Sequence, residues 1–285
     1  MKNQSYDSFG NTVKRGFIGM PIAIRTIVAI NAIFFVIQSL GGPALNSWLI
    51  PNFGFDPSFP TVFTQPWRMI TYSFLHAGFF HFLFNMLWLW WMGRPVEEKI
   101  GPRSFTVVYL GATILGALLD AGLAQIFGGA LVIGASGAVT GILVAFAVLF
   151  PRTPIMLFLL PPIEARFFVV GWIAIDILFL GNGDNVARLV HLGGALGGYL
   201  LIKAHKNGND LSKVFRYFEY LFRGLKPSKT PKPKNSNMSI VKDVEIVEEV
   251  DQSELDEILE KISKSGYDAL TKEEKQKLFE LSKKN

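Results

Sequence analysis

Cysteine is absent from the 285 residues of this sequence, and histidine occurs only four times. Without cysteine the chain has no disulfide bond, no cysteine nucleophile and no thiolate metal site. The sequence also lacks an HExxH motif. His76 and His81 are five positions apart, a spacing that does not put two metal ligands on one helix face. We therefore expect no metal centre.

Charged residues are scarce in residues 1–205 and frequent in residues 206–285. The net charge of +5 comes with no recognisable nucleic-acid-binding module, so we expect no nucleic-acid partner. The first 20 residues lack the apolar core of a cleavable signal peptide. Long uncharged apolar runs dominate instead, and the longest occupies residues 130–150. These features predict a membrane domain with several crossings and a polar tail.

We expect an all-α membrane protein with six membrane helices. Several are shorter than the roughly 20 residues of a full crossing, as a helix can be when it ends at a water-filled cavity inside the protein. The expected spans are 26–42, 78–93, 105–127, 135–150, 166–180 and 186–203.

Lysine and arginine predict the orientation of these helices. They gather before the first helix, between the second and third, between the fourth and fifth, and after the sixth, whereas the opposite side has only Arg68 and Arg188. By the positive-inside rule both termini are cytoplasmic, and the loops 43–77, 128–134 and 181–185 face outward. The loop 43–77 is too apolar for a free linker, so we expect it to fold onto or into the outer leaflet.

Strongly polar side chains inside a membrane bundle are costly and usually functional. Ser136 and His191 both lie near the outer ends of their predicted helices, the fourth and the sixth. An activated serine oxygen must come within about 3 Å of an imidazole nitrogen. Glycine pairs at four-residue spacing on both helices favour such a close approach. The polar residues are His81, Asn85, Asp120, Ser136, Thr140, Asp176 and His191, and the glycines are Gly137, Gly141, Gly194 and Gly198.

His81 and Asn85 are four residues apart and so share one helix face. Both side chains can donate hydrogen bonds, as an oxyanion hole requires. The backbone N–H of Ala135, at the start of a helix, could add a third donor.

Five segments in register resemble the rhomboid family of intramembrane serine proteases, over residues 20–205. They are WR at 67–68, HAGFFHFLFN at 76–85, GRPVEEKIG at 93–101, GASG at 134–137 and HLGGALGG at 191–198. A GxSG motif alone would be weak support, but five ordered segments are specific.

The resemblance implies a six-helix bundle with a pocket open to the outside, Ser136 as nucleophile, His191 as general base and no cofactor. It implies that His81, Asn85 and Ala135 bind the oxyanion. Supporting residues would be His76, Trp67 and Arg68 in the outer loop region, Glu97 at the cytoplasmic end of the second helix, and Gly134, Gly137, Gly194 and Gly198. The substrates would be single-spanning proteins in a bacterial plasma membrane. They would enter beside the second and fifth helices and be cut near the outer end of their span.

Thr140 stands where many bacterial relatives have a tyrosine that packs on the histidine ring. The sequence therefore assigns His191 no partner that orients its ring. We expect Asp120 and Asp176 to lie near the membrane interface, bonded to loops. Two other functions stay open: an inactive rhomboid-like protein that binds membrane clients, and a proton-coupled transporter that uses Asp120 and Asp176.

The expected division of the chain is a cytoplasmic segment at 1–20, a protease domain at 21–205, a juxtamembrane segment and linker at 206–248, and a helical hairpin at 249–285. Basic and aromatic residues alternate in 211–226, which favours contact with membrane lipids. The hairpin has two predicted helix starts, at Ser253 and Thr271. The sequence assigns the tail no cytoplasmic partner.

Overall fold

The computed structural model describes residues 16–157, 161–180, 182, 187–223, 252–265, 269–271 and 273–275. The chain divides into two compact units, Met1–Pro227 and Ser228–Asn285. Most of the segment 1–20, the linker 227–237 and most of the second hairpin helix lie outside the described residues, as does nearly all of the loop 181–185.

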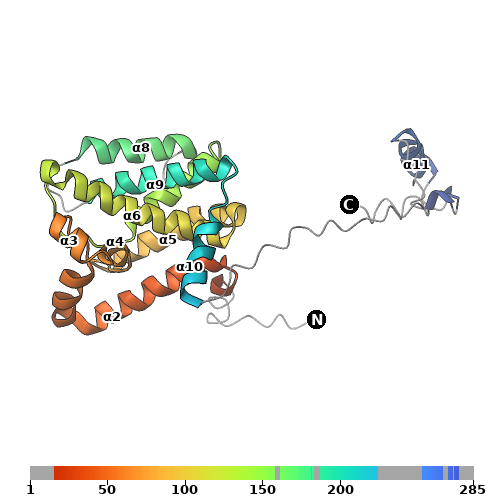
Figure 1. Cartoon of the computed structure of the whole chain (residues 1–285). Helices are drawn as coiled ribbons and strands as arrows, with labels where there is room; N and C mark the ends of the chain where they lie inside the picture. Colours follow the sequence, from red (N-terminus) through yellow and green to blue (C-terminus); the bar gives the residue numbers. More distant parts are fainter. Residues whose placement is uncertain are drawn as a thin grey trace, which may run out of the picture. The chain divides into compact units, whose positions relative to one another are not determined.

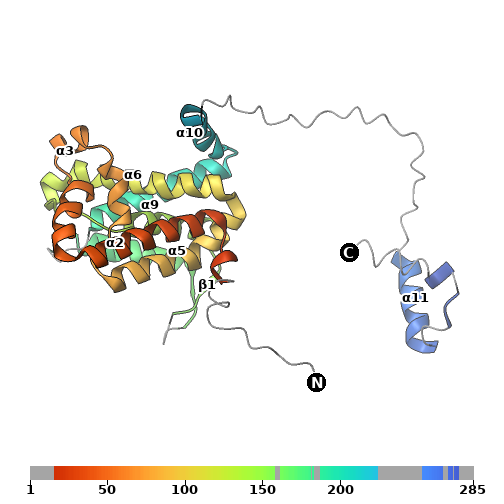
Figure 2. The same ribbon diagram turned by 90° about the horizontal axis from the view of Figure 1, so that it is seen from below.

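The first unit is almost entirely helical (Figures 1 and 2). Its only described strands, β1 and β2, pair antiparallel in the connection between α7 and α8. The elements in chain order are α2 (Ile22–Phe53), α3 (Phe59–Thr64), α4 (Arg68–Thr71), the 3-10 helix η1 (Tyr72–Phe74), α5 (Phe79–Ile100), α6 (Pro102–Phe127), α7 (Ser136–Leu149), β1 (Pro154–Ile155), β2 (Ile163–Glu164), α8 (Ala165–Leu178), α9 (Arg188–Lys206) and α10 (Ser212–Arg223).

Helix α7 is the central helix of this unit. It packs against α5, α6, α8 and α9, and every residue from 137 to 147 is buried. Figure 1 shows α8 along one side of the bundle and α2 along the other. The 14 residues of α7 are about 21 Å long at 1.5 Å per residue. A bilayer core is about 30 Å thick, so α7 is too short to cross it fully.

The outer helices expose large apolar side chains. Phe80 and Phe84 on α5 are more than half exposed, as are Val170 and Leu178 on α8. Such an extended apolar surface is rare on soluble monomers and suits a lipid boundary. In the described part of the chain, two helices are both long and apolar enough to cross a membrane, at Ile22–Phe53 and Pro102–Ala124.

One helix boundary differs from the sequence prediction and another agrees with it. The second predicted helix does not end near Gly93, because α5 continues to Ile100 and a single residue, Gly101, separates it from α6. The first predicted helix does end at Gly42, where a non-helical conformation with φ +59° divides α2 into two helical stretches. Pro43 follows the kink, and proline is favoured in the first turn of a new helix because that turn needs no N–H partner.

The segment 43–77, which the sequence analysis predicts to face outward and not to be a free linker, is ordered. Beyond the kink, it contains the end of α2 and the short elements α3, α4 and η1. Phe55 pairs in an isolated bridge with Val132, which connects this region to the segment before α7.

Glu97 connects α5 to the beginning of α2. Its carboxylate oxygens accept the backbone N–H groups of Ala23 at 2.8 Å and Ile24 at 2.9 Å, and the side chain is buried. The first N–H groups of a helix have no partner within the helix, and the helix dipole attracts a negative charge there. A single carboxylate thus satisfies two buried donors of another helix.

We expect Glu97→Ala to destabilise the protein by about 1–3 kcal/mol, since two buried donors lose their acceptor. Thermal unfolding in detergent measures the effect. The neighbouring Glu98→Ala is the matched control, because Glu98 is exposed and pairs with exposed Arg94 at 2.9 Å. Equal melting temperatures for the two variants would contradict this interpretation.

The second unit contains α11 (Gln252–Ser265). It also contains Thr271, where the sequence predicts the start of the second hairpin helix. The backbone N–H of Thr271 donates to Glu274 Oε2 at 2.7 Å, and the N–H of Glu274 donates to Thr271 Oγ1 at 3.3 Å. This reciprocal pair is the capping box that the sequence predicted. The Lys261 amine, bonded to Glu274 at 2.9 Å, lowers the pKa of that carboxyl.

Candidate active site

Ser136 is the first residue of α7, and the glycine two positions before it allows a close approach by another helix. Gly134 has φ +128°, and its N–H donates to the carbonyl of Tyr72 at 2.9 Å. A Cβ at Gly134 would lie 2.6 Å from the His81 ring. Glycine is therefore needed for both its backbone conformation and its contact with His81.

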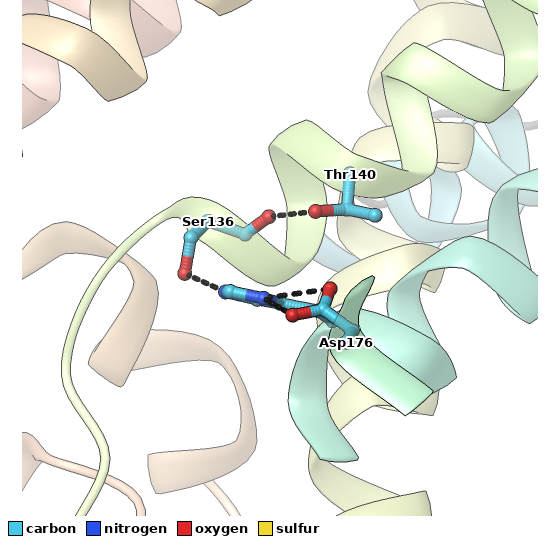
Figure 3. A network of polar contacts seen from close by, with 4 residues as sticks. Ser136, Thr140 and Asp176 are labelled. Atoms are coloured by element: carbon cyan, nitrogen blue, oxygen red, sulfur yellow. Dashed lines mark hydrogen bonds and ion pairs between the residues drawn. The ribbon is translucent and has the colours of Figure 1, made fainter. Parts of the chain in front are cut away.

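His191 reaches Ser136 from α9. The Nε2 atom of His191 lies 2.8 Å from Ser136 Oγ, in the range of a hydrogen bond (Figure 3). The two residues are 55 positions apart in the sequence, so the packing of α7 against α9 brings them together.

Glycines make that packing close. A Cβ on Gly194 would lie 2.0 Å from the carbonyl oxygen of Gly137, and one on Gly198 would lie 2.1 Å from that of Gly141. Real Cβ atoms do not come so near a carbonyl oxygen, so only glycine permits this separation of the helices. The close approach predicted from the glycine spacing is present at these residues.

Asp176 lies on the other side of the His191 ring. Its carboxylate oxygens are 3.1 and 3.3 Å from His191 Nδ1, and both side chains are less than a tenth exposed. The expectation that Asp176 is bonded to loops near the interface is therefore wrong, because α8 packs against α9 and directs this side chain inward. Asp120 is similarly buried but lies on α6.

Thr140 does not contact the histidine through its hydroxyl in the described structure. Its Oγ1 donates to the backbone carbonyl of Ser136 at 2.8 Å (Figure 3). This bond from a threonine to the preceding turn is common within helices. It anchors the side chain along the first turn of α7.

His81 and Asn85 face the same cavity as Ser136. The backbone N–H of Ala77 donates to His81 Nδ1 at 3.3 Å, so a neutral ring carries its proton on Nε2. Asn85 donates one amide hydrogen to the His81 carbonyl at 2.7 Å, which leaves its second amide hydrogen for another acceptor. Each residue can thus present one donor.

The cavity has a volume of about 360 Å³ and is largely apolar. Four lining residues are polar, and the six others come from α5, α7 and α8. The polar ones are His81, Asn85, Ser136 and Thr140, and the apolar ones are Phe80, Phe84, Trp88, Val139, Leu143 and Trp172. An apolar pocket with a few convergent polar groups is typical of a binding site.

His76 supports the site from the side of the outer loop. Its backbone N–H donates to Gln38 Oε1 at 2.9 Å, and its ring packs edge-on against His81 with the ring centres 5.2 Å apart. Burial lowers the pKa of His76 to about 3, so the ring is neutral at pH 7. It therefore packs against His81 without adding a charge.

Trp67 and Arg68 hold the outer loop region together. Trp67 donates from Nε1 to the Asn52 carbonyl at 3.2 Å. Arg68 is buried; its Nε donates to the Gly54 carbonyl, and Nη1 donates to Gln65 at 3.2 Å. Neither residue lines the cavity. Among the described residues, no group of three or more histidine or acidic side chains is arranged to hold a metal ion.

Comparison with known proteins gives two family matches. Residues 64–205 match the Rhomboid domain. Residues 248–284 match a family of unknown function (DUF6576). Rhomboid protease GlpG of Serratia proteamaculans (strain 568) is 27% identical over 183 residues, which make up 64% of this chain and 61% of that protein. The chain thus spans less than two thirds of that relative's length.

Proposed function

Because this chain belongs to the rhomboid family, as its motifs predicted, we propose that it is an intramembrane serine endopeptidase. The observation that carries the proposal is the 2.8 Å contact between Ser136 Oγ and His191 Nε2 beside an apolar cavity. A serine bonded to a histidine that can take its proton is the arrangement of an activated nucleophile.

In the proposed reaction, His191 Nε2 removes the proton of Ser136 as Oγ attacks the substrate carbonyl carbon. The carbonyl π electrons move to oxygen, and the resulting oxyanion accepts hydrogen bonds from His81, Asn85 and the Ala135 N–H. The tetrahedral intermediate collapses, the peptide C–N bond breaks, and His191 gives its proton to the leaving amine. Water, deprotonated by His191, then hydrolyses the acyl-enzyme and restores Ser136.

The proposed substrates are single-spanning membrane proteins, cut near the outer end of their span. The cavity supports this proposal, because α5 and α8 both contribute to its walls and both expose apolar side chains outward. A substrate helix would arrive through lipid between these two helices. The apolar lining would accept the chain beside the scissile bond.

The proposed membrane arrangement has α2, α5, α6, α7, α8 and α9 as six spans in a bacterial plasma membrane, with both termini cytoplasmic. The lysines and arginines that flank the spans support this topology.

The protease domain is proposed at 21–205 and the juxtamembrane segment and linker at 206–248. In the latter, α10 would contact lipid headgroups. The hairpin is proposed at 249–285.

Labelling by a fluorophosphonate probe in membranes tests the nucleophile. We expect the wild-type protein to be labelled, and Ser136→Ala and His191→Ala to lose the label, because one lacks the oxygen and the other its base. Ser104→Ala is the control, since Ser104 is a buried serine of α6 outside the cavity, and this variant should label normally.

Equal labelling of the wild type and Ser136→Ala would contradict the proposal. Absence of label on a folded wild type would favour the client-binding function instead. Proton-coupled flux that survives Ser136→Ala would favour the transporter.

A further inference from the structure

We propose that Asp176 is the positioning residue of His191, the residue that orients the ring of the Ser136–His191 pair. This inference rests on the proposed function of Ser136 and His191. Asp176 would hold the histidine ring in the one orientation and tautomer that can accept the serine proton.

The geometry is that of a ring held at both nitrogens. Nε2 lies 2.8 Å from Ser136 Oγ, and Nδ1 lies 3.1 and 3.3 Å from the two carboxylate oxygens of Asp176 (Figure 3). The three side chains come from three helices, α7, α9 and α8. With both nitrogens in contact, rotation of the ring would break two hydrogen bonds.

The carboxylate also selects the tautomer. An ionised carboxylate only accepts hydrogen bonds, so the proton of the neutral imidazole must lie on Nδ1. The lone pair is then on Nε2, which can take the proton of Ser136. When His191 becomes an imidazolium during the reaction, the adjacent negative charge stabilises it, and the low polarity of the buried site strengthens that attraction.

Other side chains around the site are bonded elsewhere. The Thr140 hydroxyl donates to the Ser136 carbonyl, and His81 Nδ1 accepts from the Ala77 N–H. Within the described residues, Asp176 is the acidic side chain that pairs with His191. It therefore supplies the orienting acceptor that the sequence analysis did not assign.

Asp176 also connects the histidine to the wall of the cavity. It lies one turn after Trp172, which lines the cavity, and it is one of three buried residues on α8 with Ala165 and Val169. Because so little of α8 is buried, the Asp176–His191 contact could alternatively serve only to hold α8 in place. The experiment must separate this structural role from orientation of the ring.

The test compares Asp176→Asn and Asp176→Ala with Asp120→Asn, in the full chain in detergent. Asp120 is the matched control because its exposure, 5%, is close to the 6% of Asp176, and it lies on a different helix.

The substrate is a synthetic single-span peptide with Ala, Gly and Ser residues at its outer end and a fluorophore and quencher on either side of them. We expect Asp176→Asn to lower kcat on the order of 100-fold or more. KM should change little, because Asp176 is not among the lining residues. Asp120→Asn should retain wild-type kcat.

The second readout is the tautomer of His191, from nitrogen-15 NMR of the histidine-labelled protein, which has only four histidines to assign. We expect the wild type to carry the proton on Nδ1 and Asp176→Ala to shift toward the Nε2 form. A purely structural Asp176 would lower the melting temperature without changing the tautomer. The wild-type spectrum stands as a test even if the variants fail to fold.

Three results would overturn the inference: an Nε2-protonated His191 in the wild type, an unchanged tautomer in folded Asp176→Ala, or equal kcat for Asp176→Asn and Asp120→Asn. Any of these, with labelling still lost in Ser136→Ala, would leave the proposed function intact. Labelling that persists in Ser136→Ala would instead overturn the proposed function.

Discussion

The Ser136→Ala variant is expected to cleave a single-span peptide at least about 10⁴-fold more slowly than the wild type, because Ser136 Oγ is the atom proposed to form the acyl-enzyme. Alanine removes only the oxygen, and Ser136 is a helix-start residue whose backbone contacts do not depend on its hydroxyl. The fold and the cavity should therefore persist. Cleavage under single-turnover conditions, with melting temperature measured in parallel, isolates the chemical effect.

Combining variants sharpens this prediction. Residues that act as one unit give strongly non-additive losses, so Ser136→Ala/His191→Ala should be no slower than Ser136→Ala alone. His81→Ala should retain the nucleophile and lose one oxyanion donor, for a smaller loss of about 10²–10³-fold. If the loss of cleavage rate in Ser136→Ala/His191→Ala equals the product of the two single losses, Ser136 and His191 act independently, contrary to the proposed mechanism.

The largest effect on stability is expected from Gly198→Ala or Gly194→Ala. The added Cβ would lie 2.1 or 2.0 Å from a carbonyl oxygen of α7, which belongs to the backbone and cannot rotate away as a side chain could. Helices α7 and α9 must then separate. Overpacking of this kind costs about 1–3 kcal/mol and sometimes more. Separation would also lengthen the Ser136–His191 contact, so activity should fall even below the melting temperature.

Gly122→Ala is the matched control for these substitutions. Gly122 lies inside α6, and an added Cβ would meet no atom within 4 Å. Alanine is a better helix former than glycine by up to about 1 kcal/mol, so this variant should be as stable as the wild type or slightly more stable. Intrinsic fluorescence of the six tryptophans during heating provides the comparison. If Gly198→Ala and Gly122→Ala melt together, the glycine contact does not limit the approach of α7 and α9.

Much of the site could be predicted from the sequence because its signals are local or depend on residue type. A serine among glycines, a histidine one turn before a glycine pair, and a histidine and an asparagine four residues apart each imply a helix face and a depth. Polar groups are rare in membrane helices, so the set of candidates was short. Five ordered motifs then pointed to one family, to which the chain belongs.

The end of the second predicted helix could not be predicted as well. The sequence prediction ended that helix near Gly93. Gly93 instead lies inside α5 with Phe105 and Ile24 packed against it, so tertiary contacts keep the helix continuous to Ile100. The role of Glu97 as an acceptor for two N–H groups of α2 depends on a contact across more than 70 residues. A contact between residues so far apart in the chain cannot be predicted from the local sequence.

From composition, spacing and motif, the sequence by itself predicted the membrane character, the family, and the serine, the histidine and the two side-chain donors of the candidate site. Only the tertiary structure decided the place of Asp176. Its sequence neighbours are apolar, and the same pattern suits a residue at the membrane interface or one turned inward. The packing of α8 against α9 turns Asp176 inward and brings its carboxylate to Nδ1 of His191, for which the sequence analysis assigned no partner.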